Sequence, residues 1–172
     1  MKYIDNFLNK ITMYKLVLYG LLILAVISIA FGFFGFLPYS GLSLIYSLVT
    51  LLVVCYGTNY VFAKIFKVQA NAESYLITSV ILFFVLFPIS NIADFETYIF
   101  MAILAMASKY IFAIKKKHIF NPVAISIFLF GLFGSGIVSW WVGSLVMTIP
   151  VAILGFLILR KVRRFTKQCK SA

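Results

Sequence analysis

The chain has very few of the side chains that enzymes most often use for chemistry. Its 172 residues include four Asp and Glu together, one His and two Cys. General acid–base pairs, nucleophilic triads and metal centres each need several such groups close together. The sequence shows no hydrolase triad, no paired carboxylates, no metal-ligand cluster and no glycine loop for phosphate, so it does not indicate a hydrolase or a metalloenzyme.

The two cysteines do not form a CxxC pair, and no His or Cys lies at metal spacing from either of them. Cys55 falls inside an apolar run, so we expect it to pack in the core, with a ligand shared across a symmetric dimer as the alternative. Cys169 lies near the end of the sequence, and Lys170-Ser171 after it is not the aliphatic pair of a prenylation box. The sequence therefore indicates free thiols in a reducing compartment.

Hydrophobic residues make up 64% of the chain, and charged residues only 11%. A water-soluble domain of this size cannot bury so much apolar surface, so the sequence predicts an integral membrane protein whose main partner is the lipid bilayer. The formal net charge of +11 would suggest nucleic acid in a soluble protein. Here the cations flank the apolar runs, where they set orientation and meet anionic lipid, and no nucleic-acid partner is expected.

Six apolar runs divide the chain, and we expect a single all-α transmembrane domain over residues 1–172. The third and fifth runs hold only about sixteen residues each, against about 20 for a full span. Short or interrupted helices often mark a site inside a membrane bundle, although a tilted fit or a shifted boundary explains them equally well. The expected spans lie near 16–37, 41–62, 75–90, 95–114, 123–138 and 141–159.

The lysines and arginines fall in alternate loops. They occur before the first span, between the second and third, between the fourth and fifth, and after the sixth. The intervening loops, near Pro38, Asp94 and Gly134, contain no Lys or Arg. Because cations favour the cytoplasmic side, the pattern predicts a multi-pass protein of the inner (cytoplasmic) membrane with both termini in the cytoplasm.

The stretch from Ser108 to Ala124 is the main polar interruption of the sequence. Asn121-Pro122 predicts a helix start, because Asn is a good N-cap and Pro suits the first helical position. A helix start beside lysines can bind a phosphate or another anion, but a plain basic loop between two spans has the same composition. Lys109 either extends to the interface or faces inward to hold an anionic group, and His118 either binds phosphate or is solvated.

Several small polar or aromatic side chains lie in or beside the apolar runs. Thr78, Ser79, Ser108 and Ser126 are the small ones, and most such groups bond back to their own helix without any further role. The aromatic residues best placed to stack on a planar ligand are Tyr110, Phe120 and Trp140.

Two stretches resemble a known family of membrane proteins. Residues 72–79 (AESYLITS), running on to Leu86-Phe87-Pro88, look like a span that opens with a polar residue and Leu-Leu-Thr-Gly and closes at proline. Residues 107–109 (ASK) and 117–124 (KHIFNPVA) are similar to a lysine-bearing helix end followed by a Phe-Asn-Pro-Ala helix start. The family is the flavin-binding membrane component shared by the sodium-translocating NADH:quinone reductase (Nqr) and the Rnf electron-transport complex.

The resemblance implies a subunit of a membrane oxidoreductase that buries FMN or riboflavin between helices and transfers electrons. Asn121, Lys109 and Thr78 match family positions, and His118 stands where some relatives have another Asn. The family's covalent Ser/Thr-Gly-Ala-Thr motif does not occur in the chain, so the resemblance implies non-covalent flavin. The residues that would line the site are Asn121, Lys109, His118, Thr78, Ser108, Phe120 and Pro122.

The family has about ten spans, whereas this chain has room for six. A shorter relative would pair with itself as a homodimer, or serve a cytoplasmic reductase or other electron-transfer subunits. Two other classes stay open from the residues alone. A small transporter or channel also has short, broken helices, and a membrane assembly protein would use the basic loops to dock a partner.

Overall fold

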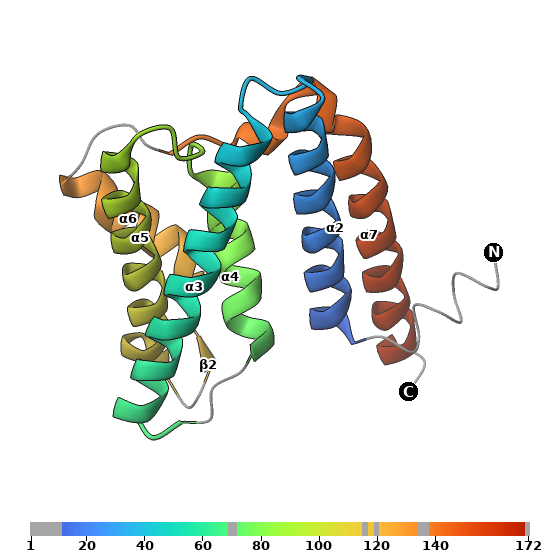
Figure 1. The fold of residues 1–172 in the computed structure, drawn as a ribbon. Helices are drawn as coiled ribbons and strands as arrows, with labels where there is room; N and C mark the ends of the chain where they lie inside the picture. Colours follow the sequence, from blue (N-terminus) through green and yellow to red (C-terminus); the bar gives the residue numbers. More distant parts are fainter. Residues whose placement is uncertain (1–11, 69–71, 115–116, 119–120, 134–137, 171–172) are drawn as a thin grey trace.

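A computed structural model describes residues 12–68, 72–114, 117–118, 121–133 and 138–170, with side chains left undescribed at 72, 113–114, 117–118, 133 and 163–170. Within these ranges the regular secondary structure is helical, apart from an isolated bridge between Leu86 and Val138 and a two-residue antiparallel pairing of β1 (Ala113–Ile114) with β2 (Lys117–His118). The all-α prediction is therefore confirmed at the level of fold class (Figure 1). The helices are α2 (Met13–Phe33), α3 (Gly41–Ile65), α4 (Ala72–Val85), α5 (Ile92–Ile111), α6 (Pro122–Phe133) and α7 (Thr148–Lys170), with 3-10 turns η1 (Trp141–Gly143) and η2 (Leu145–Met147).

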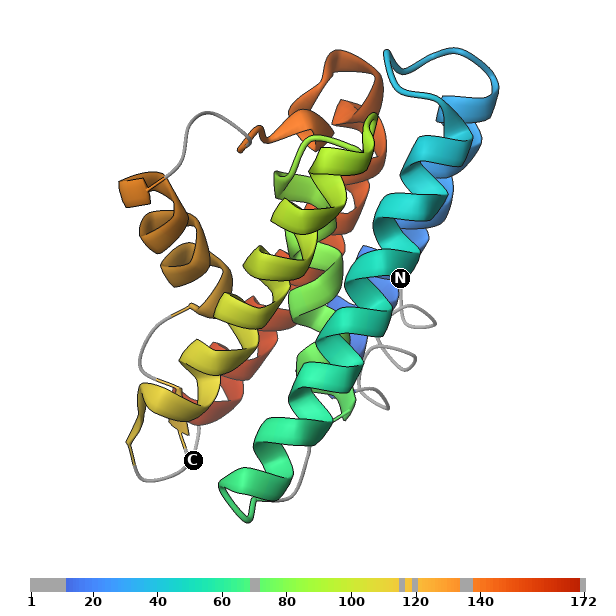
Figure 2. The same cartoon turned by 60° about the vertical axis from the view of Figure 1, so that its left-hand side comes forward.

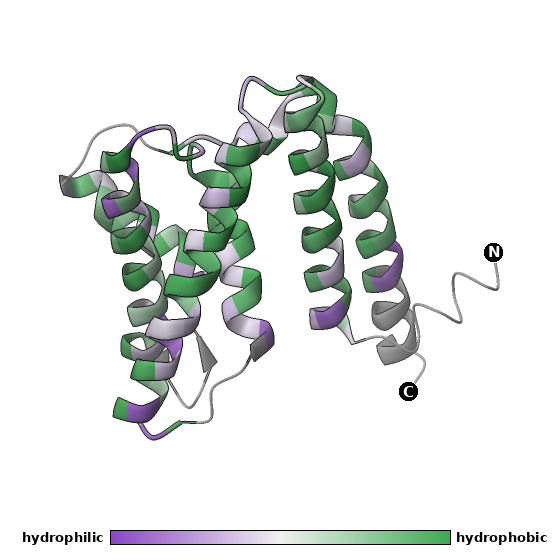
Figure 3. Ribbon diagram, in the orientation of Figure 1, coloured by the Kyte–Doolittle hydropathy of each residue, from purple (hydrophilic) through white to green (hydrophobic). Residues whose placement is uncertain are grey.

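Three stretches in the described part of the chain are long and apolar enough to cross a membrane. They are Met13–Phe33, Gly41–Ile65 and Leu145–Val162, the last of which combines η2 with the first part of α7. Helix α5 has 20 residues but includes Asp94, Glu96 and Lys109. Figure 3 shows the hydrophobic residues running along most of each helix, with hydrophilic positions concentrated near the helix ends.

The helices form a bundle in which α3 has a central position. It packs against α2, α4 and α5, while α6 packs on α5 and α7 packs on α2. Figure 1 shows α2 and α7 side by side, and Figure 2 shows α6 slanting away from the other helices toward its C-terminal end. The core is lined by large apolar side chains, including the fully buried Phe83, Leu44, Leu51, Met101 and Met106.

The helix caps explain several of the observed boundaries. Thr12 and Ser40 cap α2 and α3 by accepting bonds from Lys15 N and Ser43 N. Asn91 begins α5 in a capping box with Asp94, whose carboxylate accepts from the N–H groups of Ser90 and Asn91. These bonds lower the pKa of Asp94, which lies in the capping turn outside the apolar part of the helix.

The two runs predicted to be short are indeed short helices. Helix α4 has 14 residues and α6 has 12, which correspond to about 21 and 18 Å, against about 30 Å for the bilayer hydrocarbon. Leu86, directly after α4, forms an antiparallel bridge with Val138, which precedes η1. The prediction was less accurate for boundaries, because the helix expected to reach Ile114 ends at Ile111 and continues into β1.

Candidate functional site

Lys109 is one of two lysines that are buried among the described residues, and the other is Lys161 on α7. Lys109 lies in the last turn of α5, where a cation is favoured by the helix dipole, and its side chain is only 5% exposed. Its Nζ donates to the carbonyl oxygen of Ser74 at 2.7 Å and to the Ser74 hydroxyl at 3.1 Å. Of the two orientations that the sequence left open, the structure therefore shows the inward one.

Ser74 is the acceptor that organises this region. Its carbonyl oxygen also accepts from Thr78 Oγ1 at 3.0 Å, so Lys109 on α5 and Thr78 on α4 meet at one atom. Next to them, Tyr110 Oη donates to Asn59 Oδ1 on α3 at 2.8 Å and to the Asn59 carbonyl at 3.2 Å. We call Lys109, Ser74, Thr78, Tyr110 and Asn59 the Lys109 cluster; its members come from three helices.

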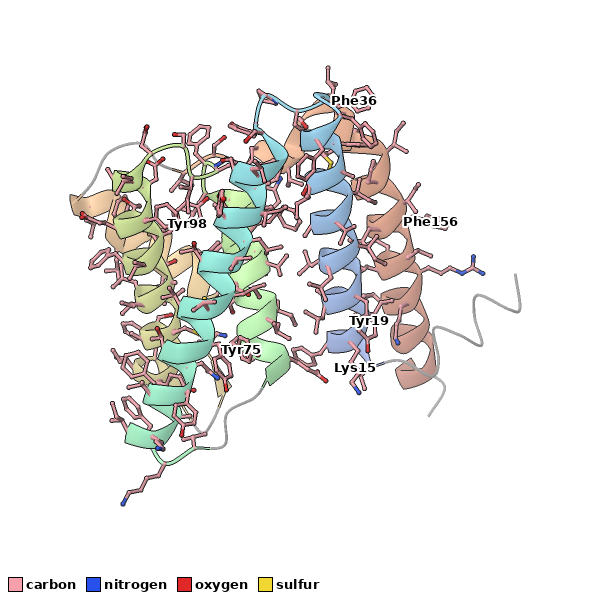
Figure 4. The ribbon with its side chains drawn as sticks, viewed as in Figure 1. Lys15, Tyr19, Phe36, Tyr75, Tyr98 and Phe156 are labelled. Atoms are coloured by element: carbon pink, nitrogen blue, oxygen red, sulfur yellow. The ribbon has the colours of Figure 1, made fainter. Side chains whose placement is uncertain are left out.

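Buried groups and ion pairs surround the Lys109 cluster. Cys55 lies one turn before Asn59 on α3 and is completely buried, as expected for a packing cysteine. Tyr110 stacks on Phe66 with ring centroids 5.5 Å apart. Glu73, next to Ser74 in the first turn of α4, lies 4.0 Å from Lys15 at the start of α2. Figure 4 shows Lys15 at the lower end of α2 and Tyr75 in the lower part of α4.

The helix start at Asn121-Pro122 forms as the sequence predicted. Helix α6 begins at Pro122, and Asn121 Oδ1 accepts from Val123 N at 3.0 Å while its carbonyl accepts from Ile125 N. Asn121 is exposed, and its Nδ2 group has no acceptor among the residues that the structure describes. Figure 2 shows α6 starting well above the lower end of α3.

The predicted site residues fall into three groups. Lys109 and Thr78 are brought together on Ser74, and Ser108 is buried beside them but donates only to Ala105 in its own helix. Asn121 and Pro122 lie at the start of α6, and no hydrogen bond between described residues joins them to Lys109. The side chain of His118 and all of Phe120 lie outside the described residues.

Sequence reasoning missed Ser74 and Asn59. Asn59 carried a usable signal, because an amide inside an apolar span is costly unless it is paired, and it is buried here. Ser74 carried none, because its role comes mainly from a backbone carbonyl, which every residue has. Sequence reasoning also missed Trp141, which is buried and whose indole donates to the Phe83 carbonyl at 3.0 Å.

The donors of this region suit an anionic or carbonyl-bearing ligand better than a metal ion. No group of three or more His, Cys, Asp or Glu gathers among the described residues. Lys109 provides a buried positive charge, and Asn121 provides amide N–H donors. Comparison with protein-family models, with curated proteins and with solved structures finds no match to this chain.

Proposed function

We propose that the protein is a membrane electron-transfer subunit that holds a flavin, FMN or riboflavin, without a covalent bond. The supporting observation is the inward, buried position of Lys109, since an ionisable side chain is retained inside a membrane bundle mainly where it has a functional partner. The resemblance of residues 107–109 and 117–124 to the Rnf and Nqr membrane proteins supplies the identity of the ligand.

Lys109 and Asn121 are the residues that we expect to contact the electron-rich ring of a reduced flavin. Lys109 would offset negative charge on the reduced isoalloxazine or on the FMN phosphate, and the Asn121 amide would donate to an edge of the ring. When bound, the flavin supplies the capacity to accept and release electrons. His118, Phe120 and Pro122, with Thr78 and Ser108, are the further residues we assign to the site.

The proposal extends to the arrangement in the membrane. Six spans with both termini in the cytoplasm would place the ends of α3, α5 and α7 on the cytoplasmic side of the inner membrane. The alternation of charged loops supports this orientation. Electrons would then come from a cytoplasmic reductase or another electron-transfer subunit, or the chain would pair with a second copy.

The test is an absorption spectrum of the detergent-purified chain before and after dithionite, with flavin quantified after extraction. We expect flavin bands that bleach on reduction, and Lys109→Met to carry far less flavin than the parent chain. Lys64→Met, which removes an exposed lysine from the end of α3, is the matched control and should retain the flavin. A colourless parent protein with no extractable flavin contradicts the proposal.

A small transporter is the second candidate, and a specific observation favours it. Helices α4 and α6 are both too short to cross the hydrocarbon, and Leu86 after α4 forms a bridge with Val138, which lies between α6 and η1 in the chain. Discontinuous helices that meet inside a bundle are common around transporter binding sites. Flux of small solutes into proteoliposomes by flavin-free protein would favour this candidate over electron transfer.

A further inference from the structure

Helix α3 ends with a lysine in a backbone conformation that suits glycine. Lys67 has φ of 52°, the left-handed region in which most side chains are strained. The end is a Schellman motif: Val68 N donates to the Ala63 carbonyl at 3.0 Å, and Lys67 N donates to the Lys64 carbonyl at 3.3 Å. Glycine is the usual residue at the position that Lys67 occupies.

Helix α2 ends with the same motif and provides an internal comparison. There the left-handed residue is Gly35, with φ of 75°, and Phe36 N donates to the Phe31 carbonyl at 2.9 Å. Among the described residues, Lys67 is the only non-glycine with a positive φ. A strained residue kept where glycine is available suggests that its side chain has a role beyond the fold.

The surroundings of Lys67 combine cations with exposed apolar side chains. Lys64 and Lys67 are both exposed, and Lys64 Nζ lies 4.9 Å from the centre of the Tyr60 ring. Ile65 is 63% exposed, and Phe66 and Val68 are each 45% exposed. Such a mixture fits the boundary of a bilayer, where apolar side chains enter the acyl region while ammonium groups remain among the headgroups.

The charges of the whole chain favour the same end of the bundle. All fifteen Lys and Arg fall in segments 2–15, 64–67, 109–117 and 160–170. The described parts of these segments lie at the lower ends of the helices in Figures 1 and 3, whereas Asp94 and Glu96 begin α5 at the opposite end. The described cations therefore lie toward the end of the bundle where α3 ends, and the acidic residues of α5 lie at the other end.

We propose that Lys64 and Lys67 form a binding site for the phosphate of an anionic phospholipid headgroup. This site borders the Lys109 cluster through the contact between Phe66 and Tyr110, but it uses other cations and does not depend on flavin. The exposed Ile65, Phe66 and Val68 favour lipid over an acidic soluble protein, because a protein partner that binds by charge would leave these side chains in water. Glycine at position 67 would relieve the backbone strain, but it would also remove one of the two cations of this site. Lipid binding therefore explains why a lysine occupies this strained position.

The experiment compares thermal unfolding of the full chain in nanodiscs of phosphatidylcholine alone and of phosphatidylcholine with phosphatidylglycerol. We expect phosphatidylglycerol to raise the Tm of the parent chain. Lys67→Gly should raise the Tm in phosphatidylcholine by about 2–4 °C through relief of strain, and should lose at least half of the increment due to phosphatidylglycerol. Lys67→Arg keeps both the charge and the strain, so it should behave like the parent.

Two outcomes overturn the proposal. One is a rise in Tm with phosphatidylglycerol that is absent in the parent, or that is equally large in the parent and in Lys67→Gly. That result would indicate that Lys67 binds an acidic protein partner and not lipid. The other is a Tm of Lys67→Gly in phosphatidylcholine no higher than that of the parent, which would mean that Lys67 is unstrained. Native mass spectrometry of retained phosphatidylglycerol gives a second readout, with fewer bound molecules expected for Lys67→Gly than for Lys67→Arg.

Discussion

Replacing Lys109 by methionine tests whether this lysine is needed to bind flavin or to stabilise the fold. The substitution removes the ammonium group and keeps a long, flexible side chain of similar volume. Two hydrogen bonds to Ser74 are lost. Hydrogen bonds to charged groups contribute about 1.5–3 kcal/mol each, so a naive sum predicts a loss of about 3–6 kcal/mol.

That sum omits the desolvation of the buried charge. Removing an ammonium group from the bundle interior recovers several kcal/mol, and replacing buried ionic groups by apolar ones of similar volume is often neutral or stabilising. The Ser74 carbonyl also keeps its bond from Thr78 Oγ1. We therefore expect Lys109→Met to change the free energy of unfolding by no more than about 1 kcal/mol, in either direction.

The assay is unfolding of the purified protein in detergent, followed by tryptophan fluorescence, with bound flavin measured on the same samples. We expect near-parental stability together with loss of flavin. Lys109→Ala should be less stable than Lys109→Met, because it also leaves a cavity beside Ser74. A Lys109→Met protein that unfolds or aggregates would refute the reasoning, since the lysine would then be holding α4 to α5.

Three further predictions concern the fold. Trp141→Phe should lower the free energy of unfolding by about 1–3 kcal/mol, because a buried carbonyl of α4 loses its donor; the exposed Trp140→Phe should change little, and equal effects would contradict the assignment. The pKa of Asp94 is lowered in the folded chain, so its stabilising contribution should be full above the unfolded value near 3.8 and fall as the pH drops through the folded value. The Tm difference between the parent and Asp94→Asn should accordingly shrink in acid, and a difference that grows there would contradict this sign. Gly155→Ala, with nothing within 4 Å, should stabilise α7 by about 0.5–1 kcal/mol, whereas Gly20→Ala should be the less stable of the two variants in the same chemical denaturation, since its Cβ would overlap a leucine side chain of α7 that must shift.

The features that follow from local chemistry could be predicted from the sequence. The helix start at Pro122 is an example, because Asn and Pro act through their own backbone and side-chain geometry. The short third and fifth helices also follow from composition, since Pro88 and the glycines near 131–136 end the apolar runs. Only the ends shifted by a few residues, where tertiary contacts decide how far a helix continues.

The contacts between distant segments could not be predicted. Nothing local to Lys109 indicates that it reaches Ser74, 35 residues earlier in the chain. Nothing local to Trp141 indicates that its indole reaches the Phe83 carbonyl of α4, 58 residues earlier in the chain. In both cases the partner is a backbone carbonyl, which has no sequence signature, so only the packing of α4 against α5 and η1 reveals it.

The C-terminal end of α4, which lies far from Ser74, helps to decide whether the protein transfers electrons or transports a solute. Chain that leaves a helix within a membrane must have its backbone groups satisfied by protein. Trp141 Nε1 donates to the Phe83 carbonyl, Ser139 N to Val85 at 2.8 Å, and Tyr98 Oη to Phe87 at 2.7 Å. A fourth carbonyl, that of Ile89, accepts from the hydroxyl of Ser43, while Ile89 N donates to Ser47 Oγ at 2.8 Å. Figure 4 shows Tyr98 in the upper part of α5, next to this segment.

Opening a path through that end would break these bonds and hydrate the groups. Five bonds at a net of about 0.5–1.5 kcal/mol each amount to about 2.5–7.5 kcal/mol, so the open state would hold between about one molecule in seventy and one in several hundred thousand. A transporter must visit that state in every cycle, whereas a flavin subunit never needs it. Cysteine introduced at Tyr98, which is fully buried, should therefore resist a membrane-impermeant maleimide added from that side, with Cys55→Ser as the background. Labelling nearly as fast as that of an exposed cysteine, in the absence of any substrate, would favour transport, because the segment would then open far more often than its hydrogen bonds allow.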